Sequence, residues 1–451
     1  MLINTIFNKV NQMNLCKLFF FSYQKAFGNN AEALYFALLK ASKEKKKVYL
    51  LYPFDIPLLF GKKLGNELLF NLRSDFIYFQ NPFLKFFTRL LVTILILPAR
   101  CVNLFINIFG YTLPQDRVVP QIGDLDLWQV SKDTKEFSWE RLGKYKWNER
   151  VDQKFQLDFS SKDYDEAQIY LKKLGISHES WFVCIHVREP GFYKDFGKKE
   201  YRNSNIEKYL PAIKEITKMG GIVVRLGDSS MSRLPKIDNV IDYPHTDCKS
   251  NLMDMYLIKY CKFYIATASG IFDAAILFGK EVLMTNSSCW IFPYALRIHD
   301  RTIIKHVYSK KHGRFLTLQE RMSSDWSMQA IWSTIDKNYI LFENSSDDIK
   351  NAVTEYLDIM HSGNFSLQEC QLIANKKRTK KAREVFAKYR LGVTSVLSDE
   401  QEITQRYRIA SRIDSSKGSI SKCFVKKYWD SEFVPTDEDD IKKLEELRRL
   451  N

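Results

Sequence analysis

Residues 181–188 read Trp-Phe-Val-Cys-Ile-His-Val-Arg, an apolar run of strand length that ends in polar side chains. Similar apolar runs follow at 222–226, 240–242, 263–266 and 281–284, and helical patterns separate them at 251–260, at 271–278 and after Ser204. Strands that are apolar throughout and alternate with helices predict a parallel sheet covered on both faces. Such a sheet binds ligands beyond the carboxyl ends of its strands.

Outward from this region, the chain predicts further α/β structure. A helical pattern at 31–40 precedes a strand-like run at 48–52, which is half of an α/β unit. A length of 451 residues suggests two domains with appendages. We therefore predict an α/β fold of two Rossmann-like domains, with 1–150 as an N-terminal α/β domain and its linker, 151–345 as a C-terminal Rossmann-like domain, and 346–451 as a helical, basic C-terminal extension.

The segment 83–110 is strongly apolar, but Arg89 and Arg100 bracket an uncharged run of only ten residues that contains Pro98. A membrane-spanning helix needs about 20 apolar residues. We expect a buried core element, and the alternative is a helix lying in a membrane interface.

The net charge of +15 implies attraction to an anion, such as nucleotide phosphate, lipid headgroups or nucleic acid. The densest basic run, 376–383, is interpreted as a solvated helix face, with contact to an anionic membrane leaflet as the alternative. Nucleic acid is not expected as a partner, because aromatic residues are not interleaved with this run.

The eight cysteines form no C-x-x-C pair and no cluster at metal-ligand spacing, so no metal site is predicted. Cys184 lies inside an apolar strand, as free thiols do in a reducing compartment. Residues 1–27 lack the pattern of a cleavable signal peptide. We expect a cytoplasmic protein, with peripheral contact to the inner face of the cytoplasmic membrane as an extension of that hypothesis.

Three polar groups follow predicted strands, where the ligand of a parallel sheet should lie. Arg188 can contact phosphate oxygens through two donors, or it can pair with Glu189 or Asp195. Arg225, with Gly227 and Asp228 at the same strand tip, can help to neutralise a diphosphate, or it can serve a structural ion pair. Ser269 and Gly270 open a helix whose N–H groups can bind an anion, although Ser269 is equally a good N-cap.

The order of these features resembles a family of bacterial glycosyltransferases associated with surface polysaccharides. The features are H-x-R-x-x-G-[FY] at 186–192, R-x-G-D at 225–228, Asp242-Tyr243, the Ser269-Gly270-Ile271 helix start and a strand that ends at Asn286. The His186-x-Arg188 element is also similar to the H-x-R signature of fucosyltransferase-type enzymes of the GT-B fold, although Glu189-Pro190-Gly191 replaces their following residues.

The resemblance implies sugar transfer from a nucleotide-sugar donor, which is a co-substrate, to a glycan or lipid-linked acceptor, with no cofactor and no tightly bound metal. It also implies a GT-B-like arrangement, in which 1–150 is the acceptor-side domain and 151–345 is the nucleotide-sugar-binding domain, and it adds Asn286 to the donor-binding residues. Candidates for the general base are His186, Glu189 and Asp195. A loop containing Gly28, Asn29 and Asn30 is expected to face the acceptor from the other half.

Two alternatives stay open. The Ser269-Gly270 segment is similar to the diphosphate-binding end of UDP-sugar 2-epimerases, and a non-catalytic nucleotide- or polysaccharide-binding protein could use the same fold. The clustering of Arg188, Arg225 and Ser269 at strand ends argues against the binding protein.

Overall fold

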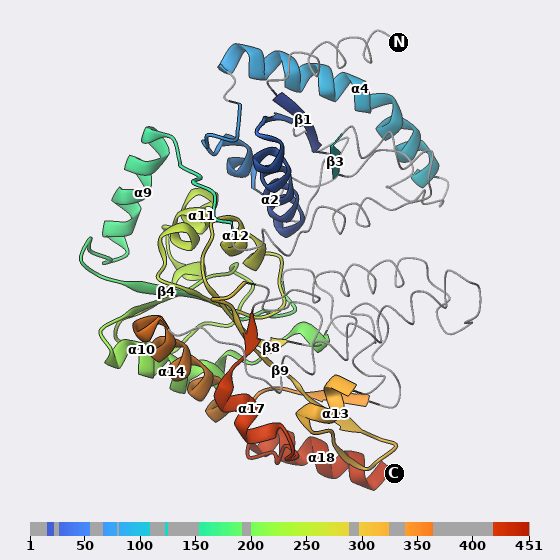
Figure 1. Cartoon of the computed structure of the whole chain (residues 1–451), viewed down its shortest axis with the longest axis vertical. Coiled ribbons are helices and arrows are strands. Elements are labelled where there is room, and N and C mark those ends of the chain that lie inside the picture. The colour runs from blue at the N-terminus through green and yellow to red at the C-terminus, as the bar shows by residue number, and fades with distance from the viewer. Residues whose placement is uncertain are drawn as a thin grey trace.

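The computed structural model describes residues 16–21, 27–54, 66–78, 81–108, 122–124, 153–191, 200–287, 297–323, 339–363 and 418–450. The basic run 376–383 and Asp195 therefore lie outside the described residues. The chain forms two α/β halves, with the N-terminal half above the larger sheet in Figure 1.

The larger half is built on a seven-stranded sheet in the order β13-β9-β8-β7-β4-β5-β6. Every strand pairing in it is parallel. The strands are β4 (Phe182–His186), β5 (Ile222–Arg225), β6 (Val240–Asp242), β7 (Tyr264–Ala266), β8 (Val282–Ser287), β9 (Arg301–Ile304) and β13 (Ser419–Ile420). The apolar runs thus form the expected parallel sheet, because strands buried on both faces need no polar alternation.

Helices cover both faces of this sheet (Figure 1), as predicted. Along β4, Cys184 belongs to one hydrophobic core, whereas Val183 and Ile185 belong to the other. The first core includes α11 (Asn251–Tyr260), α12 (Phe272–Leu277) and α9 (Ser161–Lys173). The second includes α10 (Leu210–Lys218), α14 (Ser346–Ser362) and α17 (Lys422–Tyr428).

The N-terminal half contains a three-stranded sheet in the order β2-β1-β3. Its strands are β1 (Cys16–Phe21), β2 (Lys47–Leu51) and β3 (Ile122–Asp124). Strands β1 and β2 are parallel and are joined through helix α2 (Phe27–Glu44), so this half also contains a βαβ unit. The 3-10 helix η1 (Glu67–Asn71) and the long helix α4 (Pro82–Ile108) complete its described part.

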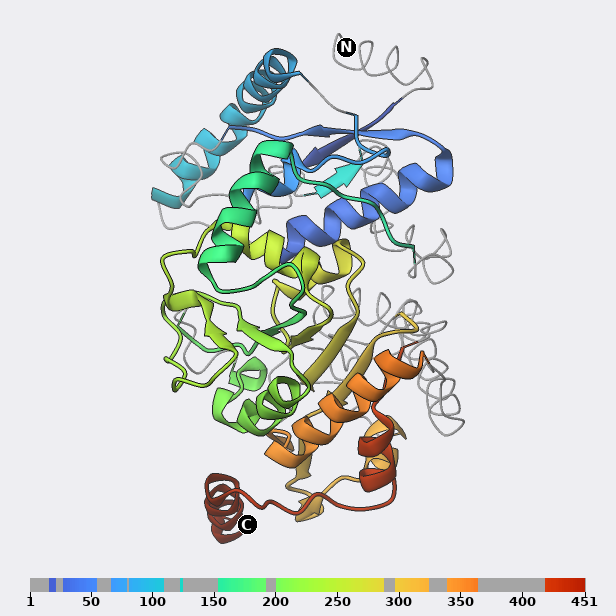
Figure 2. The same cartoon turned by 90° about the vertical axis from the view of Figure 1, so that its left-hand side faces the viewer.

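Helix α2 joins the two halves by packing on α12, and Figure 2 shows it lying across the upper helices of the larger half. Leu34 and Leu38 of α2 share one buried cluster with Ala274 and Leu277 of α12. The halves therefore have a continuous apolar core on this side.

The described parts of 346–451 contribute to the larger half. Strand β13 pairs with β9 at the edge of the sheet, and α14 covers the same face as α10. A small antiparallel sheet of β10 (His306–Ser309), β11 (Arg314–Phe315) and β12 (Tyr339–Phe342) lies beside α13 (Leu318–Ser323), and α18 (Glu438–Leu450) ends the chain. The boundaries at 150 and 345 stay predictions. Within the described ranges, no helix is long and apolar enough to cross a membrane.

Candidate functional site

The carboxyl ends of three adjacent strands bring the predicted polar groups to one edge of the large sheet. In the register of the sheet, Ile185 lies beside Arg225 and His186 lies beside Ala266. Arg188 and Ser269 each follow one of these strands by two or three residues. His186 Nδ1 is 3.0 Å from Ser269 Oγ, so the β4 and β7 ends are in direct contact.

Arg188 is almost completely buried and is held at several points. Its backbone N–H donates to Thr267 Oγ1 at 2.8 Å, and its carbonyl accepts from the backbone N–H of Ser204 at 3.1 Å. Its guanidinium donates to the side-chain oxygen of Asn203. These contacts fix the position of Arg188, while Glu189, one of its two expected structural partners, is bound elsewhere.

Arg225 has no exposed surface and lies between two carboxylates. Its guanidinium is 2.5 Å from Glu189 Oε1 and 3.2 Å from Asp242 Oδ1, and it also donates to the carbonyl of Ser232. Of the two roles that the sequence left open for Arg225, this arrangement is the structural ion pair. A direct contact between Arg225 and a donor diphosphate stays a prediction, and it would require these pairs to open.

Glu189, a candidate general base, is part of the same cluster. Besides Arg225, it accepts hydrogen bonds from the backbone N–H of Ser232 at 2.9 Å and from the Ser232 hydroxyl at 3.1 Å. Its carboxylate therefore anchors the loop after β5 to the end of β4.

His186, the second candidate base, is buried at the end of β4. Burial, followed by the positive charge of Arg225, lowers the pKa of its imidazole to about 3. Because the ring is neutral at pH 7 and has a low affinity for protons, it is a weak general base under those conditions. Its contact with Ser269 instead links the two strand ends.

Ser269 does not cap the helix that comes after it. Helix α12 begins at Phe272 with Ile271 as its N-cap, without a side-chain cap hydrogen bond, and the Ser269 hydroxyl faces His186. The helix has only six residues, so its dipole is weaker than the sequence pattern suggested. Gly270 lies against Gly28 of the other half, where a Cβ on Gly270 would be 3.2 Å from the Gly28 nitrogen.

Gly227 and Asp228 shape the turn after β5. Gly227 has a φ of +152°, and a Cβ there would overlap the Met231 side chain. Asp228 accepts a hydrogen bond from the backbone N–H of Ser230 at 2.9 Å. These contacts account for both residue types without a ligand, so their donor-binding role stays a prediction.

The expected loop at 27–30 is wrong, because Phe27, Gly28, Asn29 and Asn30 form the first turn of α2. Gly and Asn have low helix propensity, but packing against the other half overrides it. A Cβ on Gly28 would overlap the backbone of Gly270 and lie 2.7 Å from the Asp273 carboxylate. Asn30 is fully buried, and the Asn29 side chain is outside the described part.

Asn286 lies near the end of β8 with a left-handed backbone, at a φ of +49°. Its amide nitrogen donates to Tyr209 Oη at 3.0 Å, and its amide oxygen accepts from the backbone N–H of Asn344 at 2.7 Å. The side-chain oxygen of Asn344 in turn accepts from the Asn286 backbone N–H at 2.8 Å. Both ends of the Asn286 amide are thus used to connect β8 with its neighbours, and its donor-binding role stays a prediction.

Sequence reasoning missed Asn203, which contacts Arg188, and also Arg202 and Lys305, which are bonded to the segments on either side of it. Arg202 Nε donates to the carbonyl of Ala268 at 2.8 Å, and Lys305 Nζ donates to the carbonyl of Asn203 at 2.6 Å. Burial lowers the pKa of Lys305 to about 8. Arg202 ends the short 3-10 helix η2 (Glu200–Arg202), Asn203 follows it, and Lys305 lies between β9 and β10, so no periodic pattern marks any of them.

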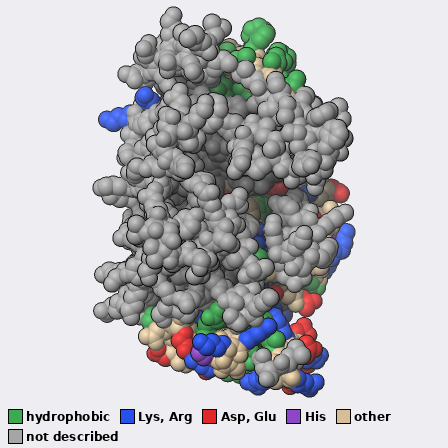
Figure 3. All heavy atoms as spheres, turned by 90° about the vertical axis from the view of Figure 1, so that its right-hand side faces the viewer, with side chains coloured by type: hydrophobic (Ala, Val, Ile, Leu, Met, Phe, Trp, Pro, Cys, Tyr) green, Lys and Arg blue, Asp and Glu red, His purple; other side chains and the backbone are tan. Residues whose placement is uncertain are grey.

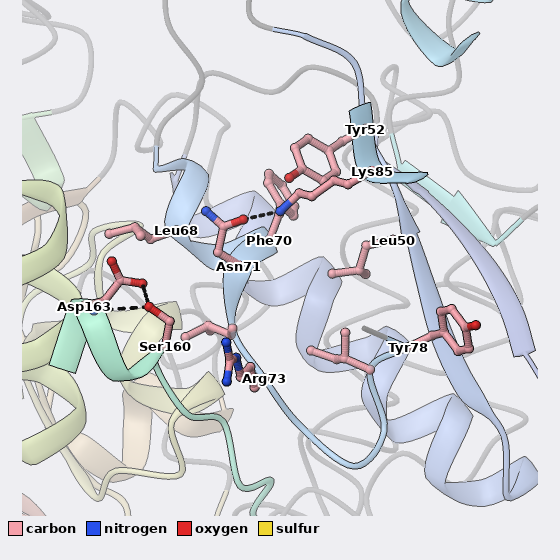
Figure 4. A pocket seen from close by; sticks show the side chains of 12 residues that line it. Leu50, Tyr52, Leu68, Phe70, Asn71, Arg73, Tyr78, Lys85, Ser160 and Asp163 are labelled. Atoms are coloured by element: carbon pink, nitrogen blue, oxygen red, sulfur yellow. Dashed lines mark hydrogen bonds between the residues drawn. The ribbon is translucent and has the colours of Figure 1, made fainter. Parts of the chain in front are cut away.

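A separate hollow of about 250 Å³ lies between the N-terminal half and the start of α9 (Figure 4), and none of the predicted site residues lines it. Tyr52, Asn71, Arg73 and Lys85 line one part, and Asp163 at the start of α9 lines another. Within the described ranges, no group of three or more His, Cys, Asp or Glu side chains could hold a metal ion. Metal independence stays a prediction.

No family model and no curated protein matches the chain. Among solved structures, it is similar to a glycosyl transferase of family 9 from Veillonella parvula DSM 2008, with a TM-score of 0.36 and 9% identity, over 64% of this chain and 85% of that one. It is also similar to ADP-heptose LPS heptosyltransferase II from E. coli, with a TM-score of 0.31 and 12% identity, over 59% of this chain and 84% of that one.

Proposed function

We propose that this protein is a GT-B-like glycosyltransferase that moves a sugar from a nucleotide-sugar donor to a glycan or lipid-linked acceptor in surface polysaccharide biosynthesis. The observation that carries the proposal is the position of Arg188. It follows the inner strand β4, is fixed by Thr267 and Asn203, and lies next to the segment where Gly270 meets Gly28 of the other half.

The charge around Arg188 suits a diphosphate. Arg202 binds the carbonyl of Ala268, and Lys305 binds the carbonyl of Asn203, so two further cations are connected to the same loops. A leaving nucleoside diphosphate gains negative charge as the sugar departs, and cations that are already positioned stabilise it most. We propose that Arg188 contacts the diphosphate directly and that Arg225 supports the loop through Glu189.

The acceptor would approach from the N-terminal half. Gly28 and Gly270 place the start of α2 against the donor side, so a sugar bound beyond β4 would lie near both halves. Three residues are candidates for the general base. His186 and Glu189 are each held by neighbours, and Asp195 is outside the described residues. Parallel substitution of the three residues would assign the base by its effect on kcat.

The test is incubation of the purified protein with UDP-, GDP- and CMP-sugars, with detection of released nucleotide. We expect slow release with at least one donor and its loss in Arg188→Ala, whereas Arg448→Ala on exposed α18 serves as the matched control. Tight nucleotide binding without release from any donor would contradict sugar transfer and favour a binding protein. Conversion of the donor sugar at C2, without transfer, would favour an epimerase.

A further inference from the structure

The exposed face of helix α4 is apolar along its described N-terminal half. Seven large side chains there are between 37% and 73% exposed, namely Phe83, Leu84, Phe86, Phe87, Leu90, Leu91 and Ile94. Their spacing places Phe83, Phe87, Leu91 and Ile94 along one side of the helix. The helix lies at the outer end of the N-terminal half (Figure 2), and hydrophobic side chains gather at that end of the surface in Figure 3.

The polar and charged side chains of the same turns point inward. Arg89 binds Glu67 at 2.9 Å and the Pro53 carbonyl at 3.2 Å, and its guanidinium lies over the rings of Tyr52 and Phe54. Lys85 donates to the side chain of Asn71. Thr93 Oγ1 accepts from the Phe54 backbone N–H at 2.8 Å.

This arrangement is the reverse of that on a water-facing surface helix, which buries its apolar face and exposes its charges. Each Å² of apolar surface left in water costs about 25 cal/mol. A continuous exposed apolar patch therefore marks a surface that meets an apolar partner. The expectation that 83–110 is a buried core element is wrong for the described turns at 83–94.

The net charge of this half favours an anionic partner surface. Residues 1–100 contain fourteen Lys or Arg against five Asp or Glu, a net charge of +9 within a total of +15. Basic residues near an interfacial helix are attracted to anionic lipid headgroups, while Phe and Leu side chains enter the boundary between headgroups and acyl chains.

We propose that residues 83–94 of α4 dock the protein on an anionic lipid bilayer, with Phe83, Phe87 and Leu91 inserted at the interface. The proposal does not depend on the donor chemistry, because the helix is remote in sequence from every donor-side residue and its test uses no nucleotide. If the activity proposed above is also correct, docking would hold the acceptor-side half close to a lipid-linked acceptor.

The test is co-flotation of the protein with two kinds of vesicle, one of phosphatidylcholine alone and one that also contains about 30% phosphatidylglycerol. A basic surface should bind vesicles with this content of anionic lipid. We expect binding to the anionic vesicles. We expect Phe83→Ser/Phe87→Ser/Leu91→Ser to reduce the bound fraction at least about tenfold, since it removes the inserted apolar surface. Because these side chains are exposed, the thermal unfolding midpoint of the variant should match that of the parent.

The matched control removes three exposed apolar side chains elsewhere, in Ile169→Ser/Met219→Ser/Val434→Ser. It should bind vesicles like the parent. The proposal would be overturned if the parent bound neither type of vesicle, or if the two triple variants bound the anionic vesicles equally. If the parent does not bind vesicles but forms oligomers, and the α4 variant does not form them, the partner of this face is a protein and not lipid. Failure here would leave nucleotide release from soluble donors unaffected.

Discussion

Arg188 is anchored by the Thr267 hydroxyl and the Asn203 amide oxygen, whereas Arg225 lies between the carboxylates of Glu189 and Asp242. Two carboxylates already compensate the charge of Arg225, so a phosphate group would have to displace them. This difference explains why Arg188 is the arginine proposed to contact the donor.

Replacing Arg188 by Ala should weaken donor binding or turnover by about 2 kcal/mol or more, because a charged hydrogen-bond donor to phosphate is lost. Isothermal titration with the active donor and kcat/KM for nucleotide release would measure the effect. Turnover equal to that of the parent would remove Arg188 from the site.

Thr267 is a positioning residue, since its hydroxyl oxygen accepts a hydrogen bond from the backbone N–H of Arg188. Thr267→Val would leave that buried N–H without its partner, at a cost of about 1–3 kcal/mol in the free energy of unfolding. Thr267→Ser keeps the hydroxyl and is the control. Because Arg188 would lose its anchor, we also expect Val, but not Ser, to raise the KM for the donor. Equal KM values for both variants would contradict this role.

His186 should make the protein less stable in mild acid. Its pKa is about 3 in the folded protein, against about 6.5 in the unfolded chain, so the unfolded chain takes up the proton first as the pH falls. Its contribution is complete above about pH 6.5 and is lost progressively toward pH 3, with a loss of about 2 kcal/mol by pH 5. Burial also lowers the pKa of His306, to about 4, and this adds a loss of the same sign.

Urea unfolding at pH 7 and pH 5 would test this prediction with His186→Asn, in which the decline should be smaller by about 2 kcal/mol. His178→Asn, which removes an exposed histidine, should keep the decline of the parent. An unchanged decline in His186→Asn would show that the ring is not held neutral by burial.

At the scale of elements, the start of α2 and the start of α12 meet through two glycines. Gly28→Ala should destabilise the protein by about 1–3 kcal/mol, because its methyl group would overlap the backbone of Gly270. The helix propensity of Ala would return at most about 1 kcal/mol. Gly270→Ala, with its nearest contact at 3.2 Å, should cost less. Urea unfolding would rank the two variants, and the reverse order would contradict the packing argument.

Element boundaries show where local signals were sufficient. The helix predicted at 251–260 matches α11, and the strand predicted at 240–242 matches β6. The helix predicted after Ser204 instead begins as the 3-10 turn η3 (Ile206–Tyr209), capped by Asn205, and continues as α10. Pro211 lacks the N–H that would bond to the carbonyl of Glu207, so the α-helix begins only around that residue.

At the scale of the whole molecule, one hydrophobic cluster runs from α2 through α12 to the sheet. The two halves should therefore unfold together. Differential scanning calorimetry of the full chain should give a single transition whose calorimetric and van't Hoff enthalpies agree. Two separated transitions would show that the shared cluster contributes little to cooperativity.

The sequence by itself determined the parallel sheet, the order of its helices and the edge at which Arg188, Arg225 and Ser269 would gather. Unbroken apolar runs, the helical patterns between them and the polar residues after each run can all be recognised within short segments of the chain. Only the tertiary structure decided which arginine is paired with carboxylates, that Asn203 holds Arg188, that Gly28 lies in a helix, and that α4 turns its apolar face outward. Those outcomes depend on contacts between residues far apart in the chain, and neither propensity nor periodicity records which neighbour a side chain will meet.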